Sequence, residues 1–318
     1  MNSLPLLEPI LARAAYLVPI LTLGLLTGEL LARLLRFDAL QASLAAWLRG
    51  LHEKLNRPQR STATRLYRGM VVCAFALFPA GLLGLLLLMQ RAAWVQLLAA
   101  ILFIALIGQL VRPYRAWQLR QRAQRGTLAL QSDQPHYLFA DHFGQLRYHI
   151  LTMAERFALL VGLALYYLIA DLPGAFLYLA LAACSALFHP SRPENRAFGW
   201  ASCALFSLLD ALPRFVACFL LWLAACFVPK ARPLGTLRHV VSAAQTYASW
   251  LAHLLHLALG GTMPSPAGER VRGWFGPGNP KPTTIDFSRT LHLLAVAYLL
   301  LIMLLSATFI DLPIDIIN

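Results

Sequence analysis

Among the acidic residues that stand inside or directly beside long apolar stretches of the sequence, three are candidates for chemistry: Glu155, Asp171 and Asp210. An ionisable group in an apolar segment is costly, so it is by default a candidate for a functional site. We expect the three carboxylates to converge on one polar cavity, with Glu155 and Asp210 as candidate catalytic residues and Asp171 as a candidate ligand-binding residue. Structural roles compete with this hypothesis. Glu155 could form a surface salt bridge, and Asp171 could cap the helix that follows it.

Basic and aromatic residues complete the candidate site. Arg214 follows Asp210 by four residues, on the same side of a helix, and is its expected partner. A structural ion pair and a pair in a substrate cavity fit that spacing equally well. The other candidate ligand-binding residues are Arg156, Trp200, Arg272 and Trp274. Trp274 stands in a Gly-rich loop, where it could line a pocket or anchor the loop at the bilayer surface.

No metal site is predicted from histidine or cysteine. His253 and His256 are three residues apart, but no carboxylate or cysteine stands near them. The five cysteines lie inside apolar segments and form no CxxC pair. They are therefore expected to be small buried hydrophobic residues.

The composition places these candidates in a membrane protein. Of 318 residues, 59% are hydrophobic and 13% are charged, whereas soluble domains carry about 25% charged residues. The net charge of +13 comes from Lys and Arg that stand mainly between the apolar runs. The positive-inside rule explains this distribution, so we expect no nucleic-acid partner.

The apolar runs predict an all-α polytopic membrane bundle of about six hydrophobic segments, forming a single membrane domain over residues 1–318. The segments are residues 10–35, 69–89, 92–110, 157–188, 198–228 and 291–310. Two of them are interrupted, one by Pro173-Gly174 and the other by Pro213. A Pro-Gly pair at mid-membrane frees backbone groups that protein or water must satisfy. The fourth segment is therefore expected to be either one broken span or a re-entrant pair of half-helices.

Three connecting segments are expected on the cytoplasmic side. Residues 36–68 and 111–156 are basic, and apolar residues at helical spacing from Ala39 to Leu55 predict an amphipathic surface helix. Residues 112–125 are expected to form a basic helix. Residues 229–290 should hold an amphipathic helix from Arg238 to Leu259, followed by an irregular Gly- and Pro-rich loop.

Several short motifs in the second half occur in a characteristic order. They are DLPGAFLY at 171–178, FGWAS at 198–202, LLDALPR at 208–214, LGG at 259–261 and RGWFGPG at 272–278. This order and spacing resembles the CobD/CbiB family of cobalamin-biosynthesis membrane proteins. Leu55-Asn56-Arg57 and Arg68-Gly69 also look like the first cytoplasmic loop of that family.

The resemblance implies an ATP-dependent ligase that uses magnesium to join adenosylcobyric acid to aminopropanol phosphate. The chain departs from the family at the site itself. Glu155 matches the glutamate of the family's first motif, but Arg156 and Leu159 replace its Asn and Asp. In the second motif, Ala204 replaces Arg and Phe206-Ser207 replaces the paired aspartates, and Asp210 stands at the Asn position.

These departures predict a degenerate synthetase site and a sensor, accessory or ligand-binding role, similar to the AmpE-like branch of the superfamily. One alternative is an active synthase, which would require ATP and magnesium. A transporter, suggested by the two interrupted segments, is the third hypothesis. The expected location is the bacterial inner membrane, as a multi-pass protein without a signal peptide. The expected partners are the lipid bilayer, an amphiphilic or corrinoid ligand, and a second copy or another membrane protein.

Overall fold

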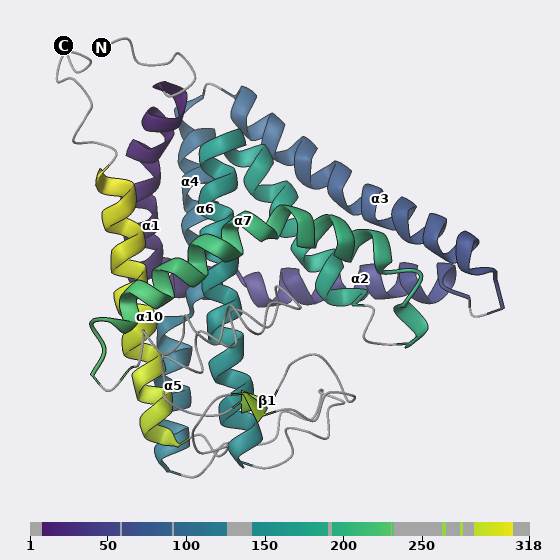
Figure 1. Cartoon of the computed structure of the whole chain (residues 1–318). Helices are drawn as coiled ribbons and strands as arrows, with labels where there is room; N and C mark the ends of the chain where they lie inside the picture. Colours follow the sequence, from purple (N-terminus) through teal and green to yellow (C-terminus); the bar gives the residue numbers. More distant parts are fainter. Residues whose placement is uncertain are drawn as a thin grey trace. The chain divides into compact units, whose positions relative to one another are not determined.

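The computed structural model describes residues 8–57, 59–90, 92–125, 142–189, 193–229, 231, 263–264, 274–275 and 283–307. Six helices in it are long and apolar enough to cross a membrane. These six spans correspond to the following helices: α1 (Glu8–Leu34), α3 (Thr62–Met89), α4 (Ala93–Val111), α6 (His142–Leu187), α7 (Trp200–Ala225) and α10 (Thr284–Ala307). The prediction of an all-α multi-pass membrane protein is thereby confirmed, and each span overlaps its predicted segment (Figure 1).

The shorter elements lie between these spans. Helix α2 (Phe37–Leu55) follows α1, and α5 (Pro113–Gln124) follows α4, so both helices predicted for the basic connections are present. A short 3-10 helix, η2 (Pro193–Asn195), stands between α6 and α7. The loop expected to be irregular contains one antiparallel pairing of two-residue strands, β1 (Met263–Pro264) with β2 (Trp274–Phe275). The amphipathic helix predicted at residues 238–259 lies outside the described residues.

The chain divides into two compact units, and α6 and α7 each contribute to both. Unit 1 contains residues 1–109, 162–213 and 306–318, and unit 2 contains residues 110–161 and 214–305. Large apolar side chains stay exposed on the spans of unit 1, for example Phe75 at 59% and Phe78 at 71% on α3. An apolar surface of this extent is suited to lipid and not to water.

Unit 1 is held together by close helix contacts. A Cβ at Gly28 of α1 would come within 2.8 Å of the Cα of Gly108 on α4, so these two helices cross with their backbones almost touching. Small residues permit such crossings between membrane helices. Helix α3 packs against residues 172–187 of α6, with Gly84 facing Pro173 and Gly81 facing Leu177. The core of this region is a cluster of Leu48, Val72, Cys73, Leu181, Cys184, Phe188 and Phe198.

Helix α6 reverses direction at Ala170 and Asp171, whose backbone angles are not helical. In one straight helix Gly162 and Tyr178 would stand about 24 Å apart. In the structure the Tyr178 side chain occupies the space that a Cβ on Gly162 would need, so residues 162–170 lie beside the first turns that follow the reversal, and Figure 1 draws the chain turning back at this point. The interrupted segment is thus a pair of half-helices and not one bent span.

The reversal contacts residues near the ends of two neighbouring spans and not their middle, where we expected it. Pro173 packs against Gly84 near the C-terminal end of α3, and Asp171 bonds Arg13 near the beginning of α1. The reversal therefore lies close to the ends of two neighbouring spans. The physical reason is length: residues 172–187 need about 24 Å of helix to return along α3, which is most of a bilayer's apolar thickness.

The second predicted interruption is absent, because α7 continues through Pro213 as one helix. A proline inside a helix leaves the carbonyl four residues earlier without its amide donor. That carbonyl belongs to Leu209, and it accepts a hydrogen bond of 2.8 Å from the Tyr166 hydroxyl. A side chain from α6 thus replaces the missing donor, and the helix keeps its course.

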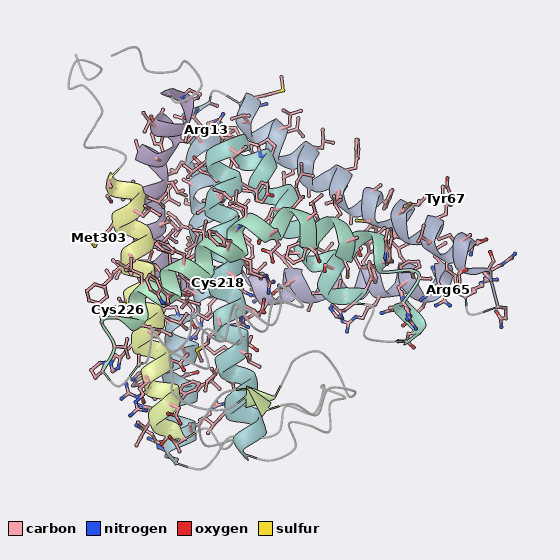
Figure 2. All side chains as sticks on the ribbon, viewed as in Figure 1. Arg13, Arg65, Tyr67, Cys218, Cys226 and Met303 are labelled. Atoms are coloured by element: carbon pink, nitrogen blue, oxygen red, sulfur yellow. The ribbon has the colours of Figure 1, made fainter. Side chains whose placement is uncertain are left out.

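Unit 2 packs its part of α6 against α10. The rings of Phe157 and Tyr298 meet edge to face with centroids 5.1 Å apart. Along α10 the buried residues are Phe287, Thr290, Leu293, Leu294, Ala297, Leu301 and Leu305. Met303 lies on the exposed side of the same helix, where Figure 2 draws its side chain pointing outward.

Candidate functional site

The reversal of α6 is closed by Arg13 of α1. Its Nη1 donates to the carbonyls of Leu168 and Ile169 at 3.0 and 2.9 Å. These carbonyls belong to the last turn before the break, and Pro173 could not have bonded the carbonyl of Ile169 in any case. The Nε of Arg13 lies 3.3 Å from Oδ2 of Asp171. One guanidinium therefore satisfies both freed carbonyls and neutralises the carboxylate.

Asp171 acts from the other side of the break. Its Oδ1 accepts a hydrogen bond of 2.7 Å from the amide of Leu172, the first residue of the second half-helix. As predicted, the Asp171 carboxylate accepts a free amide at the beginning of this half-helix, although the donor is the first residue and not the second or third as in a usual N-cap. The backbone of Asp171 has φ 58° and ψ −153°, a region that is almost restricted to glycine. The next turn is equally crowded, because a Cβ at Gly174 would stand 2.6 Å from the carbonyl oxygen of Tyr166.

Asp210 lies in the interior of unit 1, on α7, with 2% of its surface exposed. Its Oδ1 accepts a hydrogen bond of 2.7 Å from the Tyr178 hydroxyl on the second half of α6. The Tyr178 ring is stacked on Tyr166 with centroids 5.0 Å apart. Tyr166 in turn holds the carbonyl of Leu209. Two stacked tyrosines thus bond a buried carboxylate and its neighbouring carbonyl on α7.

Glu155 and Arg214 belong to unit 2, where they bond each other. Nη1 of Arg214 lies 3.2 Å from Oε1 of Glu155. The side chain of Glu155 is 44% exposed and that of Arg214 is 14% exposed. Arg214 was expected to pair with Asp210, which stays a prediction, and the structure places Arg214 against the other candidate catalytic carboxylate. The four-residue spacing on α7 could not reveal this partner, because Glu155 comes from a different helix.

The remaining predicted site residues are distributed over both units. Arg156, on α6 in unit 2, is half-buried. Trp200 is the first residue of α7, and 55% of its surface is exposed. Trp274 belongs to β2, but its side chain and all of Arg272 lie outside the described residues.

A polar cluster that our sequence analysis did not single out joins the α2–α3 turn to the α6–α7 connection. We define it as His52, Asn56, Arg65 and Asn195. Nε2 of His52 lies 2.6 Å from Oδ1 of Asn195 and 2.8 Å from Nδ2 of Asn56. Asn56 and Arg65 both donate to the carbonyl of Glu194, and Arg65 also bonds Oδ1 of Asn56 at 2.8 Å.

Two aromatic rings hold His52 within this cluster. Phe188 is stacked on the imidazole with centroids 5.6 Å apart, and Phe198 meets it edge-on at 5.1 Å. Asn195 is buried, with 1% of its surface exposed. The cluster therefore fixes the connection before α7 against α2. A sequence signal did exist, because Asn56 stands in one of the motifs named above and the residues between the fourth and fifth apolar segments are polar. Nothing in the sequence indicated that these two regions meet.

Arg13 is a further residue that our sequence analysis did not single out. An arginine within the apolar run of α1 is costly without a partner, and this was the available signal. The partner lies more than 150 residues away in the sequence, as the separation of Arg13 from Leu168 shows. Local patterns cannot identify such a pair.

The three candidate carboxylates each contact a protein side chain: Asp171 contacts Arg13, Asp210 contacts Tyr178, and Glu155 contacts Arg214. Among the described residues, no group of three or more His, Cys, Asp or Glu side chains is arranged to hold a metal ion. Comparisons of the chain with protein-family models, with curated proteins and with solved structures find no match.

Proposed function

We propose that the protein is a divergent member of the CobD/CbiB superfamily in the bacterial inner membrane. In this proposal it binds an amphiphilic or corrinoid ligand as a sensor or accessory protein and does not catalyse amide formation. The motif order in the second half of the chain supports the family, and the missing Asn, Arg and aspartates support the loss of the reaction.

The observation that carries the proposal is the bonding of the three candidate carboxylates Glu155, Asp171 and Asp210. Each already accepts a hydrogen bond or ion pair from a protein side chain, at 3.3 Å from Arg13, 2.7 Å from Tyr178 and 3.2 Å from Arg214. Magnesium needs near-octahedral oxygen ligands, usually one or two carboxylates plus water and substrate phosphates. Carboxylates that neutralise arginines or accept from a phenol serve the helix framework more than a catalytic ion.

The first test is catalysis by the purified full chain. With ATP, magnesium, adenosylcobyric acid and aminopropanol phosphate we expect no amide formation, and we expect no rescue of a synthase-deficient strain. Glu155→Gln and the exposed Glu194→Gln form a matched pair of variants. Robust turnover that Glu155→Gln abolishes and Glu194→Gln retains would overturn the proposal.

The second test is ligand binding, with adenosylcobinamide as the probe. A ligand at a hundred times its Kd stabilises the folded protein by about 2.7 kcal/mol, which thermal unfolding in detergent can measure. We expect stabilisation of the wild type and a smaller effect in Arg214→Gln. Equal midpoints with and without the probe would remove corrinoids from the candidate ligands.

One observation favours a second candidate function, an active synthase. The side chain of Glu155 is 44% exposed, so its second oxygen is accessible to a metal ion or substrate. In that case Glu155 would be the carboxylate that holds magnesium, and Arg214 would be released to a phosphate. The turnover assay with Glu155→Gln separates this function from the first.

A further inference from the structure

Helix α2 is attached to unit 1 along one side. Near its N-terminal end, Gln109 at the end of α4 donates to Asp38 at 2.7 Å and to Gln41 at 3.2 Å. In the middle, Leu48 is buried in the core cluster. Near the C-terminal end, His52 bonds Asn195. The helix is therefore fixed and cannot turn to hide its other sides.

A second side of α2 is apolar and exposed. Leu40, Leu44 and Trp47 follow one another at spacings of four and three, with 61%, 52% and 44% of their surfaces exposed. The Trp47 ring lies 5.8 Å from the ring of Phe75 on α3, which is itself 59% exposed. The apolar side of α2 thus continues directly into the lipid-facing surface of a membrane span.

The third side of α2 is small and polar. Ala42, Ala46, Arg49 and Glu53 are exposed there, about half a helical turn from the apolar residues at 100° per residue. Figure 1 draws α2 crosswise to α1 and α4, immediately after the end of α1. A helix with lipid-facing and water-facing sides that runs across the ends of two spans is typical of the membrane interface.

Basic residues surround the C-terminal end of α2. Lys54, Arg57 and Arg60 are exposed, and Arg65 and Arg68 follow at the beginning of α3. Arg65 donates to the carbonyl of Glu194 in the α6–α7 connection, and Arg68 donates to the carbonyl of Leu55. Figure 2 places Arg65 and Tyr67 on opposite sides of α3. The acidic residues of this region are Glu53 and Glu194. Positive charge therefore dominates where the apolar side of α2 ends.

We infer that α2 is a lipid anchor: Leu40, Leu44 and Trp47 enter the acyl boundary, and Lys54, Arg57 and Arg60 bind anionic lipid headgroups. The occupant of this surface is the anionic leaflet of the bilayer, because the apolar side continues into the lipid-facing surface of α3 and the adjoining charge is positive. Each basic residue beside an anionic leaflet favours association by up to about fivefold.

The test uses the full chain in bilayers of brominated phosphatidylcholine, whose bromine quenches tryptophan fluorescence. The contribution of Trp47 is the difference between the wild type and Trp47→Phe. We expect Trp47 to be quenched, and Leu44→Gln to reduce that quenching. The matched variant Ala42→Gln, on the water-facing side, should leave it unchanged. If the fluorescence of Trp47 is not quenched by brominated lipid, the proposal is overturned. If the quenching of Trp47 decreases as the protein-to-lipid ratio rises, a second copy and not lipid covers this surface, which also overturns it.

Headgroup preference is measured in the same bilayers by adding unbrominated phosphatidylglycerol. If anionic lipid gathers at α2, it displaces brominated lipid and the quenching of Trp47 falls more than by simple dilution. The double variant Arg57→Gln and Arg60→Gln should abolish this preference, whereas Arg49→Gln should keep it. If brominated lipid is displaced equally in the wild type, the double variant and Arg49→Gln, the basic end of α2 does not select anionic lipid.

Discussion

Pro173 in α6 and Pro213 in α7 lie in the same unit, and each lacks the amide that would bond the carbonyl four residues earlier. Helix α6 nevertheless reverses beside its proline, whereas α7 continues through its own. At Pro213 one carbonyl is freed, that of Leu209, and one neutral hydroxyl from Tyr166 satisfies it. At the reversal, the carbonyls of Leu168 and Ile169 and the amide of Leu172 all need partners. They are satisfied by a charged pair, Arg13 and Asp171.

The difference shows how the number of freed backbone groups sets the kind of side chain that is needed. In an apolar medium each unsatisfied group costs several kcal/mol, so one missing bond needs one donor. A full reversal needs a donor that serves two carbonyls and an acceptor for the next amide. Arginine provides several donors in one fixed plane, and aspartate provides the acceptor and the opposite charge.

The largest effect is expected for Arg13→Leu. This change removes the donor of both carbonyls and leaves the Asp171 carboxylate, which is 18% exposed, without its cation. Loss of one partner of a largely buried pair costs about 3 kcal/mol or more. Unfolding of the purified protein by denaturing detergent would measure this loss.

Arg289→Leu is the matched control for Arg13→Leu. Arg289 lies 3.3 Å from Asp286, and both side chains are exposed to a similar extent as in the first pair. Arg289 contacts this local carboxylate three residues earlier, and no helix reverses there. We expect a loss below about 1 kcal/mol. Equal losses in the two variants would show that closing the reversal contributes nothing beyond an ordinary ion pair.

Gly84→Ala tests the packing of the reversal against α3. The new Cβ would stand 2.6 Å from the Cα of Pro173, and backbone atoms cannot rotate away. Overpacking of this kind costs about 1–3 kcal/mol. Gly50→Ala on α2 meets no atom within 4 Å and should stabilise the protein by roughly 0.5–1 kcal/mol. The changes in unfolding free energy of the two variants should therefore have opposite signs. If Gly84→Ala stabilised the protein, α3 would lie farther from Pro173 than the structure shows.

Two substitutions of Asp171 separate backbone strain from the loss of its carboxylate. Both Asp171→Ala and Asp171→Gly remove the bonds to Arg13 and Leu172, but only glycine adopts φ 58° and ψ −153° without strain. The glycine variant should therefore be more stable than the alanine variant by about 1 kcal/mol or more. At Ala42, an exposed position in the middle of α2, glycine should instead cost roughly 0.5–1 kcal/mol. Stability measurements that rank alanine above glycine at both positions would contradict strain at Asp171.

The sequence was sufficient to locate the spans because hydropathy is a local property. The apolar run at residues 69–89 lies within α3 and ends with it, and residues 92–110 match α4 almost to the residue. The break in α6 was also predictable, because Pro173 and Gly174 cannot continue an undisturbed helix. Continuity at Pro213 was not, because it depends on a tyrosine in another helix.

The partners of the candidate site residues depend on tertiary packing and were not predictable. Glu155 and Arg214 come from different helices, as do Asp210 and Tyr178. The spacing of four residues between Asp210 and Arg214 is typical of an ion pair on one side of a helix, so the sequence indicated a pair within α7. Which cation meets which carboxylate is decided by how the helices cross, and the sequence does not encode this in any local pattern.

The smallest effect is expected for Tyr166→Phe, which removes one hydroxyl and keeps the ring stacked on Tyr178. The carbonyl of Leu209 then loses the donor that lies at 2.8 Å, and such a loss costs about 1 kcal/mol. Tyr67→Phe, at a side chain that is 67% exposed, should change stability by less than about 0.5 kcal/mol.

Pro213→Ala restores a backbone amide that can bond the same carbonyl, so Tyr166→Phe should become nearly neutral in that background. The two substitutions would then be strongly non-additive in a double-mutant cycle. Additive losses would mean that the tyrosine does not replace the amide that Pro213 lacks, and α7 would owe its continuity to packing alone.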